Sequence, residues 1–88
     1  MQYKIKYSDT IKKDLKKLDG YTRKNIQSWI SKHLENCEDP KKIGKPLTGN
    51  SKGQWRYRIG DYRLICIIEE DVLLITAIRV GHRKYIYE

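Results

Sequence analysis

The chain has 88 residues and a formal net charge of +8, from 19 basic and 11 acidic side chains. A chain of this length forms one small domain, residues 1–88, with a modest core. Its hydrophobic share of 39% excludes intrinsic disorder, and no segment approaches the roughly 18 apolar residues of a membrane span. The charge favours a polyanionic partner, such as RNA, DNA, a ribosome or an acidic protein, over a merely soluble basic protein.

The cysteines give no sign of a secreted framework or a metal site. Cys37 and Cys66 are the only two, and we expect buried free thiols, late in a helix and in mid-strand. No cysteine and histidine pair has zinc-site spacing, so no metal or cofactor is expected. The N-terminus lacks the apolar region of a signal peptide, which makes the cytoplasm the expected location.

The first elements are a short strand and a helix. Apolar and basic residues alternate over residues 3–7, as in a strand with one buried face. Ser8 and Asp9 are candidate N-caps for the helix that follows. Its apolar stripe consists of Ile11, Leu15 and Leu18. Asp19-Gly20 is expected to end this helix.

A second helix is expected from Thr22, its candidate cap, to about Cys37. Its apolar positions recur at helical spacing and are Ile26, Trp29, Ile30, His33, Leu34 and Cys37. Glycine and proline punctuate the chain from Glu38 to Gly53, which therefore predicts a loop.

The rest of the chain has the two-residue period of strands. We expect strands over residues 54–59, 62–69 and 72–80, with turns at Gly60-Asp61 and Glu70-Asp71. The order β-α-α-β-β-β predicts an α+β fold of two layers, with two N-terminal helices packed on a mostly antiparallel four-stranded sheet.

Arginines face one another across the first of these hairpins. A two-residue turn at Gly60-Asp61 puts Arg58 directly opposite Arg63, with Arg56 on the same face. Like charges in such a position are destabilising. We therefore favour an anion site between the guanidinium groups over a solvated basic face.

The C-terminal stretch carries further candidate RNA-binding residues: Arg79, His82, Arg83, Lys84, Tyr85 and Tyr87. The register of Arg79 depends on whether the preceding hairpin has a two- or three-residue loop. His82 is a candidate for proton transfer or for a structural hydrogen bond. The two tyrosines suit stacking on a base, contact with a phosphate or closure of the sheet edge.

Any catalysis in this chain must be cationic, since no carboxylate pair, phosphate loop or Ser/His/Asp set appears. Phosphodiester transfer in RNA fits a cationic site, because the 2′-hydroxyl supplies the nucleophile. The protein then holds that hydroxyl in line and neutralises the charge that develops on phosphorus.

Two stretches carry a resemblance to a known family. They are the run from Gly53 to Leu64 and the run Val80-Gly81-His82-Arg83, followed by Ile86-Tyr87. With the order of elements and the loop residues Pro40, Lys45-Pro46-Leu47 and Gly49, they are similar to the RelE branch of the RelE/ParE toxin superfamily. The resemblance covers nearly the whole chain.

The resemblance implies a microbial-ribonuclease-like fold and a toxin of a type II toxin–antitoxin system, which cleaves mRNA in the ribosomal A site. By position, Arg56 and Arg58 contact the scissile phosphate region and Arg63 binds a phosphate. Arg83 stabilises the transition state, and Tyr87 stacks on or orients the mRNA. A RelB-like antitoxin is the expected partner.

We expect that antitoxin to cover the basic face and three apolar residues assigned to the same side of the sheet, Ile65, Ile67 and Ile75. An acidic amphipathic segment, added as a helix or as an edge strand, suits this role.

One departure from the family leaves the general base open. Some members have lysines where this chain has Arg56 and Arg58, and an arginine stays protonated. His82, Tyr87 and a water are the candidates. The alternative functions are a gyrase-poisoning toxin of the ParE branch and a non-catalytic module that binds nucleic acid or an antitoxin.

Overall fold

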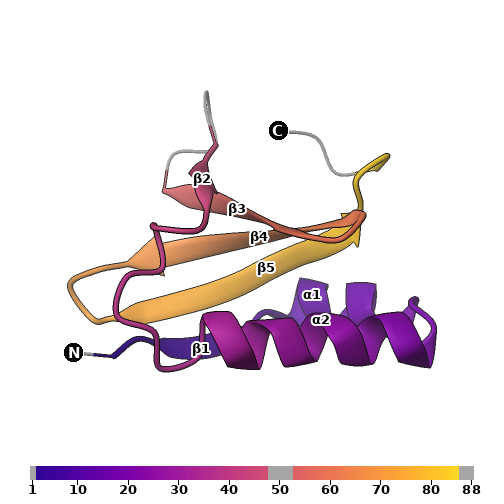
Figure 1. The fold of residues 1–88 in the computed structure, drawn as a ribbon, viewed down its shortest axis with the longest axis horizontal. Coiled ribbons are helices and arrows are strands. Elements are labelled where there is room, and N and C mark those ends of the chain that lie inside the picture. The colour runs from indigo at the N-terminus through magenta and orange to yellow at the C-terminus, as the bar shows by residue number, and fades with distance from the viewer. Residues whose placement is uncertain (1, 48–52, 86–88) are drawn as a thin grey trace.

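The computed structural model describes residues 2–47 and 53–85, and both helices lie on one side of the sheet (Figure 1). The elements are β1 (Lys4–Tyr7), α1 (Asp9–Lys16), α2 (Gly20–His33), β2 (Lys45–Pro46), β3 (Gln54–Ile59), β4 (Tyr62–Glu69) and β5 (Leu74–His82). Within the described ranges, neither helix has the length and apolar character needed to cross a membrane.

The sheet has the strand order β1-β5-β4-β3-β2. β1 runs parallel to β5 and the other neighbours are antiparallel. This arrangement confirms the two-layer α+β fold. The predicted sheet of four strands was one strand short, however, because β2 lies in the segment expected to be loop.

Contacts with Tyr57 hold the segment that contains β2 against the sheet. The Tyr57 hydroxyl donates a hydrogen bond of 2.5 Å to the carbonyl oxygen of Pro40. A Cβ on Gly44 would come within 2.8 Å of the Tyr57 ring, so only glycine fits without a shift. The segment therefore packs closely against β3, where Lys45 pairs with Arg56 and Pro46 pairs with Trp55.

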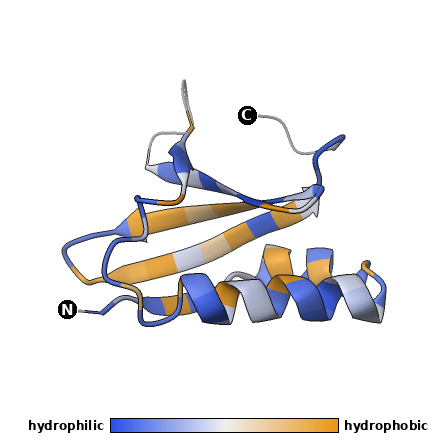
Figure 2. Cartoon of the chain, viewed as in Figure 1, coloured by the Kyte–Doolittle hydropathy of each residue, from blue (hydrophilic) through white to orange (hydrophobic). Residues whose placement is uncertain are grey.

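The core is formed by residues of β1, both helices and the strands β3, β4 and β5, and Figure 2 marks the hydrophobic residues along these elements in orange. Its largest fully buried side chains are Tyr57, Ile11, Ile26, Ile30, Leu34, Leu64, Ile75 and Cys66. Burial of one such aliphatic side chain contributes about 1.5–3 kcal/mol. The expectation that Ile75 lies on the outer face was wrong, since it belongs to this core. Ile65 is also buried already, and Ile67 is half-buried.

The helix boundaries differ from the predicted ones at three points. Ser8 caps α1 as expected, but α1 stops at Lys16. Asp19 caps α2 in place of Thr22, whose backbone N–H donates to the Asp19 carboxylate. These contacts with Thr22 hold the pKa of Asp19 below its ordinary value.

α2 ends at His33 rather than near Cys37 because the chain turns to meet β1. Asn36 has a left-handed backbone with φ of 61°. Its N–H donates to Tyr3 O, and Tyr3 N–H donates to Cys37 O, both over 2.9 Å. His33 is exposed.

The first hairpin has the predicted register, whereas the turn of the second is longer than either of the two loop lengths considered. Gly60 has φ of 60°, which the tight Gly60-Asp61 turn requires. The second turn takes four residues, 70–73, and Leu73 adopts φ of 52°. β5 therefore runs from Leu74 to His82 rather than over residues 72–80.

Candidate functional site

The outer face of β3 and β4 carries the predicted arginine ladder. Arg58 lies directly opposite Arg63, as expected, and Arg56 lies opposite Ile65. The three side chains differ in burial, which the sequence did not indicate. Arg58 is exposed and Arg63 is half-buried, whereas Arg56 is only 8% exposed. The aliphatic stem of Arg56 thus packs within the protein, as arginine stems do beside apolar surface.

A cationic cleft of about 220 Å³ opens on this face. Its lining residues are Ile43, Lys45, Arg56 and Arg58. We refer to it below as the basic cleft. Three cations and one apolar side chain around a small hollow suit a phosphate with a sugar or base beside it.

Lys45 is the cation of this cleft that the sequence did not predict as a site residue. Its cross-strand pairing with Arg56 brings it there, and that pairing exists only because β2 docks on β3. A two-residue strand next to Pro46 has no periodic signal in the sequence. The position of Lys45 depends on the close contact between Gly44 and Tyr57, and this contact forms only in the folded protein.

Arg83 follows the end of β5, beside the β3–β4 turn. Its backbone N–H donates to Asp61 O over 2.8 Å. The β4–β5 register puts Gly81 opposite Arg63, so no β5 side chain stands directly beside Arg63. Arg83 is exposed. Its backbone lies beside the turn of the hairpin that carries Arg58 and Arg63. Tyr87 lies outside the described residues.

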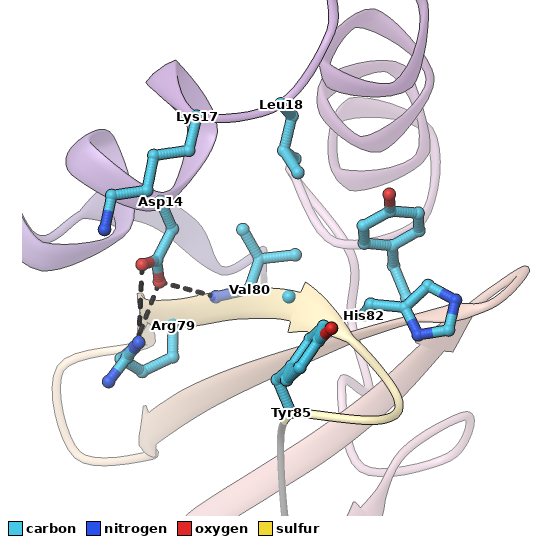
Figure 3. A pocket seen from close by; sticks show the side chains of 9 residues that line it. Asp14, Lys17, Leu18, Arg79, Val80, His82 and Tyr85 are labelled. Carbon is cyan, nitrogen blue, oxygen red and sulfur yellow. Dashed lines mark hydrogen bonds and ion pairs between the residues drawn. The ribbon is translucent and has the colours of Figure 1, made fainter.

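Three of the predicted RNA-binding residues line a different cavity, shown in Figure 3. They are Arg79, His82 and Tyr85. Arg79 lies opposite Ile65, and its Nε donates to Asp14 over 3.0 Å at the edge of β5. The His82 Nδ1 accepts a hydrogen bond of 3.2 Å from the Lys84 backbone. Tyr85 is 77% exposed and Lys84 is exposed.

The buried titratable groups do not supply proton-transfer chemistry. Burial raises the pKa of the Cys66 thiol and of the Tyr57 phenol well above their ordinary values, so both stay neutral at physiological pH. Cys66 and Cys37 are free thiols, with Cys66 buried and Cys37 half-buried. Among residues 2–47 and 53–85, no three His, Cys, Asp or Glu side chains gather closely enough to hold a metal ion.

Comparison with known proteins identifies the class to which this chain belongs. A family model described as the ParE toxin of the type II toxin–antitoxin system, parDE, matches residues 5–87. Toxin RelG of Mycobacterium tuberculosis is 30% identical over 87 residues, which cover 99% of this chain and 98% of that toxin. Toxin RelE3 of Methanocaldococcus jannaschii is 31% identical over 91 residues, covering 97% and 96%.

Solved structures agree with the sequence comparisons. The toxin–antitoxin complex RelBE2 of Mycobacterium tuberculosis contains a chain that superposes with a TM-score of 0.85, at 28% identity over 94% of this chain and 93% of that one. The isolated RelE toxin of E. coli shares the fold, with a TM-score of 0.69 at 17% identity over 91% and 83%.

Fold and relatives thus define a toxin of a type II toxin–antitoxin system. Within that class, the chain belongs to the RelE family of the RelE/ParE toxin superfamily.

Proposed function

We propose that this toxin is an endoribonuclease that cleaves mRNA in the ribosomal A site and so stops translation. The observation that carries the proposal is the basic cleft, where Lys45, Arg56 and Arg58 surround a hollow of about 220 Å³. A cluster of cations with no carboxylate among the described residues of its lining matches a phosphodiester better than any neutral or cationic substrate.

In this mechanism the 2′-hydroxyl of the RNA attacks the adjacent phosphorus, and the 5′-oxygen of the next nucleotide leaves. Arg56 and Arg58 hold the scissile phosphate region and Arg63 binds a phosphate oxygen. Arg83 neutralises charge on the pentacoordinate transition state. Positioning and charge stabilisation supply most of the acceleration in such chemistry, and Tyr87 orients the base beside the cleavage point.

The proton acceptor is a separate question, because guanidinium groups stay protonated. His82 accepts a hydrogen bond from the Lys84 backbone and lines the other cavity. That arrangement favours Tyr87 or a water as the base. The basic cleft adds Lys45 as a further candidate, since an ammonium group exchanges protons and a guanidinium does not.

An antitoxin completes the proposed function. RelB and RelE form a solved antitoxin–toxin complex from Methanococcus jannaschii, and we propose a RelB-like protein as the partner of this chain. Because the toxin has a net charge of +8, it attracts an acidic partner segment.

One observation favours a second function. The matching family model bears the description of a ParE toxin, and the ParE branch shares this fold while it poisons DNA gyrase. That alternative gives no role to the three cations Lys45, Arg56 and Arg58 around one cleft, so we place it second.

Induction of the chain alone in bacteria, followed by pulse labelling, separates the two functions. We expect growth arrest in which protein synthesis falls before DNA synthesis. The matched control is the double variant Arg58→Ala/Arg83→Ala, which should leave growth intact. DNA damage signalling that rises first, while translation continues, would support the gyrase function instead.

A further inference from the structure

A second cavity lies at the opposite edge of the sheet from the basic cleft. It has a volume of about 450 Å³, twice that of the basic cleft, and it opens between the end of α1 and the end of β5 (Figure 3). We call it the edge cavity. Leu18 and Val80 supply aliphatic walls that point into it. Tyr62 also lines it.

The strand pairing explains why this edge is open. β1 pairs with β5 only from Leu74 to Ala77, so β5 continues to His82 without a neighbouring strand on that side. α1 covers the first part of the gap, where Ser8 Oγ donates to Ile78 O over 3.1 Å. Beyond this point the edge of β5 faces the cavity.

Asp14 fixes one end of the cavity. Its carboxylate accepts from the Val80 backbone over 3.1 Å and from Arg79 Nε over 3.0 Å. The charge of this carboxylate is therefore neutralised within the protein. The lining also includes the cationic side chain of Lys17. The exposed lysines Lys12, Lys13 and Lys16 extend the positive surface along α1.

We propose that the edge cavity anchors an acidic amphipathic segment of the antitoxin. An apolar side chain of that segment enters between Leu18 and Val80, while a flanking carboxylate pairs with Lys17. This inference rests on the proposed toxin–antitoxin function. Aliphatic walls with cations confined to the rim fit the alternation of apolar and acidic residues in such a segment. A strand of RNA would instead use cations within the hollow itself, as in the basic cleft.

Two pairs of variants test the proposal against matched controls. The probe is the antitoxin encoded by the reading frame beside the gene for this chain, and its affinity is measured by calorimetry at one fixed salt concentration. Leu18→Asp puts a charge into the cavity and should weaken binding about 100-fold, as loss of a central anchor does. Its control is Val72→Asp, at an exposed apolar residue in the β4–β5 turn.

The second pair reverses a charge inside and outside the cavity rim. Lys17→Glu should weaken binding about tenfold, whereas Lys12→Glu, with the same change of net charge within α1, should change it less than about threefold. Far-ultraviolet circular dichroism and thermal unfolding verify that each variant is folded. Cleavage of mRNA by Lys17→Glu and Leu18→Asp should stay at the wild-type rate.

Equal losses in the paired variants would overturn the proposal, as would a wild-type chain without affinity for the antitoxin. Full antitoxin affinity combined with lost mRNA cleavage would assign the cavity to RNA instead. A wild-type chain that binds the antitoxin through Leu18 but cleaves no mRNA would overturn the proposed nuclease function alone and support the anchor.

Discussion

The helix-covered face of the sheet and its outer face are built from the same strands, but their side chains meet opposite kinds of neighbour. On the covered face, Tyr57 lies opposite Leu64, and both are fully buried. On the outer face, Arg58 lies opposite Arg63 and Lys45 opposite Arg56. Apolar pairs stabilise a sheet, whereas like charges directly opposite destabilise it by about 0.2–1 kcal/mol each.

The difference between the two faces distinguishes side chains that stabilise the folded state from side chains that do not. The covered face is explained by burial alone, since replacing its side chains with polar ones would remove the core. The outer face contains two cross-strand pairs of cations that oppose folding. Three of these four cations, Lys45, Arg56 and Arg58, line the basic cleft. A chain that gathers cations in this way is expected to use them for an anion, and the first test is to remove them one at a time.

The largest expected effect is on cleavage by variants of the exposed arginines. Arg58→Ala or Arg83→Ala should slow single-turnover mRNA cleavage by about 10²–10³, the usual loss when a charge-stabilising contact to the transition state is removed. The free energy of unfolding of Arg58→Ala should stay constant or rise slightly, because repulsion from Arg63 is relieved. Lys32→Ala, which removes one exposed cation from α2, is the control. Wild-type cleavage by both arginine variants would refute the site.

Tyr87 is the last residue along the chain that is proposed to contact the RNA. If its ring stacks on the RNA, Tyr87→Phe should retain most cleavage and Tyr87→Ala should lose roughly 10–100-fold, the value of one stacked base. If the hydroxyl transfers a proton, Phe should be nearly as damaging as Ala. The ratio of the two single-turnover rates decides between these roles, and wild-type rates in both would assign the tyrosine a structural role.

Replacement of Lys45 should lower the cleavage rate without lowering the stability of the fold. Lys45→Gln should slow cleavage about tenfold through loss of one charge-assisted contact with phosphate. The same variant should unfold at equal or higher denaturant concentration, because the repulsion between Lys45 and Arg56 disappears. Lys42→Gln removes an exposed lysine of the same segment that does not line the cleft, and it should change neither quantity. A parallel loss of stability and activity would show that Lys45 is structural.

Tyr57 gives the smallest expected effect on cleavage and tests the covered face. Tyr57→Phe leaves the buried Pro40 carbonyl without its donor and should lower the free energy of unfolding by about 1–3 kcal/mol. The exposed residue Tyr21 provides the control, Tyr21→Phe, with an unchanged denaturation midpoint. Cleavage at low temperature should be nearly normal in both.

The same phenol predicts how stability depends on pH. Burial raises the pKa of Tyr57 above its ordinary value of 10. The folded state thus holds this proton more tightly than the unfolded chain, and stability is lost as pH rises above about 10. Tyr57→Phe lacks this contribution, so its denaturation midpoint should fall less steeply over the alkaline range.

The sequence predicted the parts of the structure that depend on local pattern. Alternation and the Gly60-Asp61 turn were enough to place Arg58 opposite Arg63. The strand β2, the early end of α2 and the start of β5 were missed. Each depends on a tertiary contact or a left-handed residue: Gly44 against Tyr57, Asn36 bonded to Tyr3, and Leu73 at φ of 52°.

The candidate site shows the same division. The arginine ladder follows from the register of one hairpin, so it could be derived from the residues. Lys45 joins the site through β2, and Arg79 leaves it because Asp14 on α1 holds its side chain at the sheet edge. Neither contact has a signature in the order of residues, since partners 11 and 65 positions apart meet only in the folded chain.

Primer extension on mRNA in a reconstituted translation reaction tests the central claim most directly. With wild-type protein, we expect new 5′ ends within the codon in the A site and a halt in peptide synthesis, and neither should occur with Arg58→Ala. Omission of ribosomes shows whether cleavage depends on them. Intact mRNA and continued translation beside an active wild-type toxin would contradict the account.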